Sequence, residues 1–392
     1  MSNEIEFETI EEEIDEEEID KKITKNKNDE ELARKYTDGQ LRIVRTTMDF
    51  PLNNFSQILE DKSYMQLNPS YQRRNRWDKK KKSLLIESLL MNIPIPPVFL
   101  FEKDYNSYEV MDGLQRLTTI EEFLNDKFSL RSLEYWSELN GKKYSDLPDV
   151  LKRGLKRRTV SAIILLAESS REISDTDIRM VLFKRLNTGG IQLNAQELRN
   201  ALYPGLFNEM LLELSRNDTF TDIWGIPKYQ ENEKDEPSNE LISNTLYKNM
   251  YDCEIVLRFF AVRDAILKNK KGSMKTLLDS CATSHSTDSK ETITILSNLY
   301  INTLRDLKSI FGDDIFRLPK INKLSIPLYD SLTVAYSIIE DKTKLLPIND
   351  IKNNLKNKLN SEHGYAILTG KLGTSKSIID RVNMAQVILL GE

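Results

Sequence analysis

The stretch Tyr108-Glu109-Val110-Met111-Asp112-Gly113-Leu114-Gln115-Arg116 joins a short apolar run, typical of a strand over 108–111, to a helical pattern over 117–125. The first amides of a helix lack intrahelical partners and carry the positive end of its dipole, so a helix that follows a strand directly is a ready anion site. Gly113 lets the backbone approach a phosphate, and the planar fork of Arg116 suits phosphate oxygens. Asp112 is expected either to cap the helix or to hold a metal ion beside the phosphates. The plainer alternative is an ordinary Asp-Gly turn with Arg116 in a surface ion pair.

Two further polar clusters contain residue types that suit a nucleotide. Tyr71-Gln72-Arg73 is followed by Trp77, and amide, guanidinium and aromatic groups together can read or stack on a nucleobase. Alternatively, Trp77 belongs to the core and Arg73 to an ion pair.

The segment 183–190, FKRLNTGG, is a polar turn after a helical pattern. It either approaches a ligand or ends the helix with a glycine cap.

The segments around these clusters predict an α+β domain followed by an all-α domain. Strands are expected at 64–67, 98–101, 108–111 and 159–167, the last of which is apolar enough to be buried on both faces. Helices are expected at 55–59, 79–92, 117–125 and 176–186. Beyond about residue 206 the strand signals fade and helical patterns dominate, at 252–268, 328–340, 350–359 and along the stripe Leu296, Leu299, Thr303, Leu307 and Ile310. We therefore predict an acidic tail over 1–35, a mixed domain over 36–205 and a helical domain over 206–392.

The charge of the chain is divided unevenly. Residues 1–20 contain eleven acids and neither Lys nor Arg. Because the net charge of the whole chain is −5, the remaining residues carry a net charge of +6. Such a tail is either a solvated, disordered segment or a mimic of DNA that covers a basic surface. Organised structure is expected to begin near Tyr36.

Cysteine and histidine are too scarce for several kinds of catalytic centre. The chain has two cysteines, Cys253 and Cys281, which we interpret as reduced thiols in a helical core, and two isolated histidines, His285 and His363. A zinc site or an HNH-type nuclease centre relies on clustered ligands, and no such cluster is visible in the sequence. Nothing near either histidine indicates a Ser-His-Asp triad.

Length and hydropathy indicate an ordinary globular protein. The 392 residues, 39% of them hydrophobic, suggest two or three units. No stretch approaches the roughly 20 apolar residues that span a bilayer, and the acidic N-terminus is not a secretory signal. We expect a cytoplasmic protein without membrane contact.

Together, the three clusters resemble the N-terminal domain family of GmrSD-type restriction systems, which is similar in fold to ParB and sulfiredoxin. The pattern PxYQRxxxW corresponds to Pro69 through Trp77, and DGQQR before a helix corresponds to 112–116. The pattern FxRLNTGGxxLNxQELRN corresponds to 183–200. Two positions depart from the family: Leu114 replaces a usual Gln, and Asn75 replaces a usual aromatic. The stand-alone members lack a recognisable HNH nuclease domain, and this chain is similar to them.

The resemblance implies a ParB/sulfiredoxin-like N-terminal domain that binds or hydrolyses a nucleoside triphosphate, with Mg²⁺ as the expected metal ion. It implies a sensor or regulatory role in anti-phage defence against foreign or modified DNA, with a separate nuclease or effector subunit. Asp112 and Arg116 would be catalytic, with Asp112 also the metal ligand. The nucleotide and its phosphates would contact Tyr71, Gln72, Arg73, Gly113, Gln115, Arg116, Arg185, Asn187 and Thr188.

Two other functions remain open. A DNA-binding protein without nucleotide chemistry would use basic residues, for which the candidates are Lys79, Lys80, Lys81, Arg157 and Arg158. A nuclease in its own right would use the acids Asp112 and Glu109. The sequence leaves the identity of the nucleotide and the oligomeric state open, a homo-oligomer included.

Overall fold

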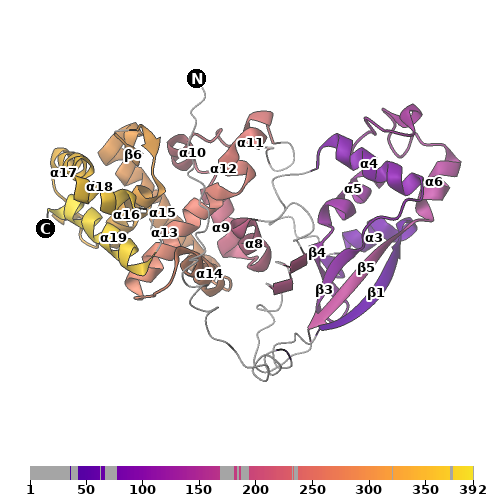
Figure 1. Ribbon diagram of the computed structural model, residues 1–392, viewed down its shortest axis with the longest axis horizontal. Coiled ribbons are helices and arrows are strands. Elements are labelled where there is room, and N and C mark those ends of the chain that lie inside the picture. Colours follow the sequence, from indigo (N-terminus) through magenta and orange to yellow (C-terminus); the bar gives the residue numbers. More distant parts are fainter. Residues whose placement is uncertain are drawn as a thin grey trace. The chain divides into compact units, whose positions relative to one another are not determined.

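The computed structural model describes residues 36, 43–61, 63–66, 77–167, 181, 182, 185, 186, 194–231, 233, 237–319, 321–370 and 374–391. These residues fall into two compact units, an N-terminal unit that ends at Leu198 and a C-terminal unit that begins at Arg199. The strands of the large sheet belong to the first unit and the second is mostly helical (Figure 1). The predicted α+β class with a helical C-terminal region is confirmed. The predicted domain boundary at residue 205 stays a prediction.

The N-terminal unit is built on a mixed sheet with the strand order β1-β5-β3-β4-β2. The pairs β1/β5 and β3/β4 are antiparallel, whereas β3/β5 and β2/β4 are parallel. The strands are β1 (Ile43–Pro51), β2 (Met65–Gln66), β3 (Val98–Asp104), β4 (Ser107–Asp112) and β5 (Thr159–Ala167). The helices are η1 (Leu52–Asn54), α3 (Phe55–Glu60), α4 (Lys79–Leu90), α5 (Leu114–Leu124), η3 (Ser137–Leu139) and α6 (Asp149–Lys156). Strand β4 has a neighbour on each side, so the predicted phosphate site begins inside the sheet.

One face of this sheet carries the hydrophobic core of the unit. Helices α3, α4, α5 and α6 supply the other side of that core (Figure 1). In β5, Val160, Ala162 and Ile164 point into it, whereas Ser161 is exposed and Ile163 is half-buried. The expectation that 159–167 is buried on both faces is therefore wrong for most of the strand. Alternating burial is the pattern of a strand that helices cover on one side.

Strand β1 was not predicted from the sequence. Its described side chains from Val44 to Asp49 are exposed, and Phe50 is the residue that enters the core. The strand is defined by backbone pairing with β5, in a register from Ile43 opposite Ala167 to Pro51 opposite Thr159. An edge strand with exposed side chains leaves little hydrophobic pattern, and its partner is remote in the sequence.

The C-terminal unit is a bundle in which two helices are buried nearly all round. These are α13 (Tyr251–Leu267) and α16 (Ile326–Ile338), with Phe259, Val262 and Tyr329 fully enclosed. The other elements are α8 (Ala195–Leu202, which contains the division between the units), α9 (Leu206–Leu214), α10 (Asp218–Trp224), α11 (Asn239–Ser243), α12 (Thr245–Lys248), α14 (Met274–Ser284), α15 (Lys290–Phe311), η5 (Gly312–Asp314), β6 (Arg317–Leu318), β7 (Lys323–Leu324), η6 (Lys342–Lys344), α17 (Ile348–Asn360), α18 (Glu362–Thr369) and α19 (Ser375–Leu390). Among the helices in the described ranges, none is both long and apolar enough to cross a bilayer.

Buried arginines form ion pairs between helices of this bundle. Arg258 on α13 binds Asp330 on α16, with Nε 3.1 Å from Oδ1. Arg199 on α8 binds Glu254 at 3.0 Å and Asp279 at 2.7 Å. A buried charge is costly unless it is paired, so these contacts fix which helix faces meet.

Candidate site at the β4–α5 junction

The junction between β4 and α5 depends on the glycine at position 113. Gly113 is the N-cap residue of α5 and has φ +99°, in the region that favours glycine. A Cβ at this position would lie 2.4 Å from Cγ1 of Val98 and 3.0 Å from Nη2 of Arg116. The helix therefore begins at Leu114, three residues before the predicted start at 117, because the chain turns within one residue.

Asp112 and Arg116 form an ion pair across this turn. Nη2 of Arg116 donates to Oδ2 of Asp112 at 2.7 Å, and Nη1 donates to the carbonyl oxygen of Pro96 at 2.6 Å. The Arg116 side chain is 12% exposed and that of Asp112 is 37% exposed. These two bonds use two of the five N–H groups of the guanidinium. The arrangement puts one carboxylate, one guanidinium and the first amides of α5 together, and the carboxylate is the more accessible of the two charged groups.

Gln115 links the same turn to the chain beside the Tyr71-Gln72-Arg73 motif. Its Oε1 accepts a hydrogen bond from the backbone N–H of Trp77 at 3.2 Å. The Trp77 ring packs against the core of the N-terminal unit, with Nζ of Lys81 4.7 Å from its centroid. The interpretation of Trp77 as a core residue is therefore the better one. Tyr71, Gln72 and Arg73 lie outside the described residues.

The third motif is described in part. Arg185 is exposed in a helical turn, and Asn187 and Thr188 lie outside the described residues. Farther along, Asn194 and Glu197 form a reciprocal cap at the start of α8: each backbone N–H donates to the other's side chain at 2.9 Å. This part of the motif has a structural role in beginning a helix.

The candidate DNA-binding residues divide into two kinds. Lys79, Lys80 and Lys81 are exposed in the first turn of α4, where the helix dipole disfavours positive charge. Arg157 is exposed as well. Arg158 instead donates from Nε to the carbonyl oxygen of Leu89 at 3.0 Å, which adds a side-chain hydrogen bond at the C-terminal end of α4. Arg158, and Lys81 over the Trp77 ring, therefore make structural contacts within the unit.

A cluster in the C-terminal unit was not expected from the sequence. Asp264 on α13 lies beside Cys281 on α14 and His285 just after it, and their potential ligand atoms are all within 4.8 Å of one another. His285 is thus not isolated, which corrects the expectation from the sequence, although both cysteines are buried free thiols as predicted. Burial, together with the Asp264 charge, raises the pKa of Cys281 well above its usual range. The four-residue spacing of Cys281 and His285 puts both on one face of a helix, which the sequence could have shown. Asp264 belongs to another helix, so its place in the cluster depends on tertiary packing.

These features define an α+β domain in which a strand, a glycine turn and a helix assemble a charged site, followed by a helical region. Residues 55–204 match the family model described as GmrSD restriction endonuclease, N-terminal domain. This part of the chain is therefore similar to the GmrSD N-terminal domain, as the motifs predicted. The match includes all three motifs. No curated protein and no solved structure matches the chain, so the likeness to ParB and sulfiredoxin stays a prediction.

Proposed function

We propose that this protein is a nucleotide-binding sensor or regulatory component of a restriction-type defence system that acts on foreign or modified DNA. The observation that supports this most is the junction of β4 and α5, where Asp112, Gly113 and Arg116 meet the N-terminal end of a helix. The GmrSD-type domain supports the restriction context. A separate nuclease or effector subunit would carry out cutting.

The charges at this junction suggest how a triphosphate would bind. A phosphate near Asp112 meets a negative carboxylate, and the repulsion is relieved when Mg²⁺ lies between the two. The same phosphate competes with Asp112 for the N–H groups of Arg116, since the guanidinium prefers paired oxygens. In this proposal a magnesium nucleotide would separate the Asp112–Arg116 ion pair.

The other predicted contacts complete the nucleotide site in this proposal. Arg73 would add positive charge beside the phosphates, and Gln115 would keep the chain near Trp77 in place through its observed bond. Asn187 would complete the wall of this site, with Arg185 and Thr188 as further contacts. Hydrolysis would require a positioned water, for which Asp112 and its metal ion are the candidates.

Calorimetry with the four nucleoside triphosphates, with and without Mg²⁺, tests this proposal. We expect Arg116→Ala to weaken binding by about ten- to a hundredfold, the loss of roughly 1.5–3 kcal/mol from a hydrogen bond to a charged group. Arg116→Lys keeps the charge and should weaken binding less. Arg131→Ala is the matched control, because Arg131 is an exposed arginine of the same unit. An absence of heat with every nucleotide in the wild type would overturn the proposal.

Hydrolysis is tested separately, by release of inorganic phosphate. Asp112→Asn should abolish release and remove the Mg²⁺ dependence of binding, because the neutral amide is a weaker ligand for a hard cation. If Asp112→Asn binds and hydrolyses like the wild type, the metal role of Asp112 is wrong. Cleavage of plasmid that is lost in Asp112→Ala would instead favour the nuclease alternative.

A second function, DNA binding without nucleotide chemistry, is favoured by the first turn of α4. Three exposed lysines at the positive end of a helix are intrinsically unfavourable, and phosphates of a nucleic acid would offset that repulsion. Binding of double-stranded DNA that falls steeply with salt and does not respond to nucleotide supports this function. Lys80→Ala should then weaken binding, whereas Lys143→Ala, at an exposed lysine elsewhere in the unit, should not.

A further inference from the structure

The C-terminal unit contains a buried group of three side chains that are all potential ligands of a transition metal. Asp264 is on α13, and Cys281 and His285 are one turn apart at the end of α14. Cys281 is 1% exposed and the His285 side chain 13% exposed. A carboxylate oxygen, a thiol sulfur and an imidazole nitrogen within 4.8 Å of one another are the donor types that Zn²⁺ takes in proteins.

The orientation of the His285 ring is an independent observation. Its Nδ1 lies 2.5 Å from Oδ2 of Asp288, and its face stacks on Phe207 with 4.7 Å between the ring centroids. These two contacts direct Nε2 toward Asp264, whose Oδ2 is 3.5 Å away. Metal-binding histidines usually give their second nitrogen to a carboxylate in this way, which fixes the tautomer and the ring.

The positive groups around Asp264 show what a cation would replace. Nζ of Lys268 is 2.7 Å and Nζ of Lys270 is 3.7 Å from Oδ2 of Asp264. Both are long side chains, 53% and 29% exposed, so each ammonium can turn to solvent without leaving a buried charge. His285 and Cys281, by contrast, are held in place by the packing of the bundle.

We propose that Asp264, Cys281 and His285 bind one divalent transition-metal ion of the Zn²⁺ class, through a carboxylate oxygen, Sγ and Nε2. The ion replaces the thiol proton, which leaves to solvent, and forms a bond to the thiolate sulfur. A tetrahedral ion has a fourth position, which water fills. The metal joins α13 to the end of α14, so the site stabilises the helical unit and is independent of the proposed nucleotide function.

Titration of the full chain with Co²⁺ tests the site, because a tetrahedral cobalt–thiolate centre has visible absorption that a carboxylate-only site lacks. We expect saturation at one equivalent in the wild type. Cys281→Ser should lose the thiolate-to-cobalt band, and His285→Gln should weaken binding by at least tenfold, in line with loss of a direct ligand. The chain holds two cysteines and two histidines, so Cys253→Ser and His363→Gln are matched controls that should keep the spectrum.

Zinc-edge X-ray absorption of the loaded wild type gives a result that does not depend on how a variant folds. The expected shell has one sulfur at about 2.3 Å with nitrogen and oxygen ligands at about 2.0–2.2 Å. A shell without sulfur overturns the proposal, as does a cobalt spectrum that is absent from the wild type or unchanged in Cys281→Ser. In that case the cluster is an ion-pair network of Asp264, His285 and Asp288.

Discussion

At the scale of single residues, Gly113 is required for two separate reasons. Its φ of +99° costs an L-residue about 1–2 kcal/mol, and its Cα faces Val98 too closely for a methyl group. The sequence alone suggests a functional reason for glycine at position 113, which is that the backbone can approach a phosphate. The structure adds a structural reason that holds whether or not a phosphate binds.

Gly113→Ala is expected to lower the free energy of unfolding of the N-terminal unit by about 2–5 kcal/mol, the sum of backbone strain and overpacking. Gly141→Ala is the control, because Gly141 also has positive φ (+84°), but no atom lies within 4 Å of the place its Cβ would take. It should lose about 1–2 kcal/mol. Urea unfolding measures both variants. Equal losses at the two positions would show that contact with Val98 is unimportant.

Leu114 shows how a departure from a family pattern is explained by its surroundings. The family has a polar residue at this position, and its absence suggested a missing ligand contact. In the structure Leu114 is half-buried and packs against the core of the N-terminal unit. The substitution therefore adds apolar contact at the start of α5 and leaves Asp112, Gln115 and Arg116 unchanged.

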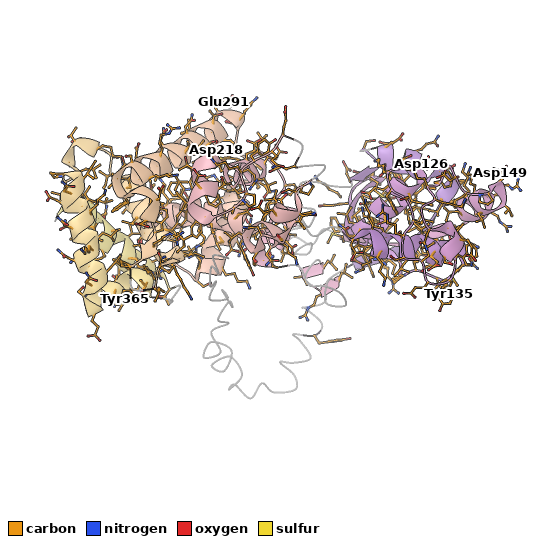
Figure 2. The ribbon with its side chains drawn as sticks, turned by 90° about the horizontal axis from the view of Figure 1, so that it is seen from above. Asp126, Tyr135, Asp149, Asp218, Glu291 and Tyr365 are labelled. Atoms are coloured by element: carbon orange, nitrogen blue, oxygen red, sulfur yellow. The ribbon has the colours of Figure 1, made fainter. Side chains whose placement is uncertain are left out.

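At the scale of elements, Glu87 joins helix α4 to the loop after α5. Its carboxylate is buried at 2% exposure and accepts backbone N–H groups from Glu134, Tyr135 and Trp136 at 2.8–3.1 Å. The Tyr135 side chain itself projects to the surface of the unit (Figure 2). Burial raises the pKa of Glu87, but the three N–H donors outweigh it and hold the pKa below its ordinary value of 4.5.

The depressed pKa of Glu87 predicts a dependence of stability on pH. Because the folded pKa is below the unfolded one, the stabilisation is complete above about pH 4.5 and is lost as the pH falls through the folded pKa. Glu87→Gln leaves at least one amide poorly paired and should cost about 1–3 kcal/mol at pH 7. The difference between wild type and variant should shrink at pH 3.

Urea unfolding at pH 7, 5 and 3 measures this effect. The control is Glu134→Gln, an exposed acid in the same loop, which should change stability by less than about 0.5 kcal/mol at each pH. A gap between wild type and Glu87→Gln that stays constant down to pH 3 would contradict an ionised Glu87 in the folded state.

The sequence predicts elements well where apolar residues leave a strong pattern, and poorly where tertiary contacts determine the structure. Helices α4 and α13 and strand β5 begin and end close to their predicted bounds, because their apolar residues leave a strong pattern. Strand β1 has no such pattern and depends on its distant partner. The same limit applies to sites. Asp112 to Arg116 is local and was predictable as a unit, whereas Asp264 meets His285 only through packing of two helices.

At the scale of the whole molecule, the distribution of charge is the feature that the fold does not explain. The acids of residues 1–20 precede a chain with a net charge of +6 and lie outside the described residues. Exposed lysines in the first turn of α4 are among the positive groups that such a tail could compete for. Competition with nucleic acid is electrostatic and therefore depends on salt.

Deletion of residues 1–20 separates the two interpretations of the tail. If the tail mimics DNA, the deletion should tighten binding of double-stranded DNA by about tenfold, or about 1.4 kcal/mol, at low salt. It should also steepen the dependence of log K on log salt, because more phosphates then displace counterions. Fluorescence anisotropy at several salt concentrations measures both quantities. A variant with the acids replaced by Gln and Asn has the same length without the charge, so it should behave like the deletion. Unchanged affinity in both would identify the tail as a solvated segment, because a chain that competes for a basic surface must raise the affinity for DNA when its charge is removed.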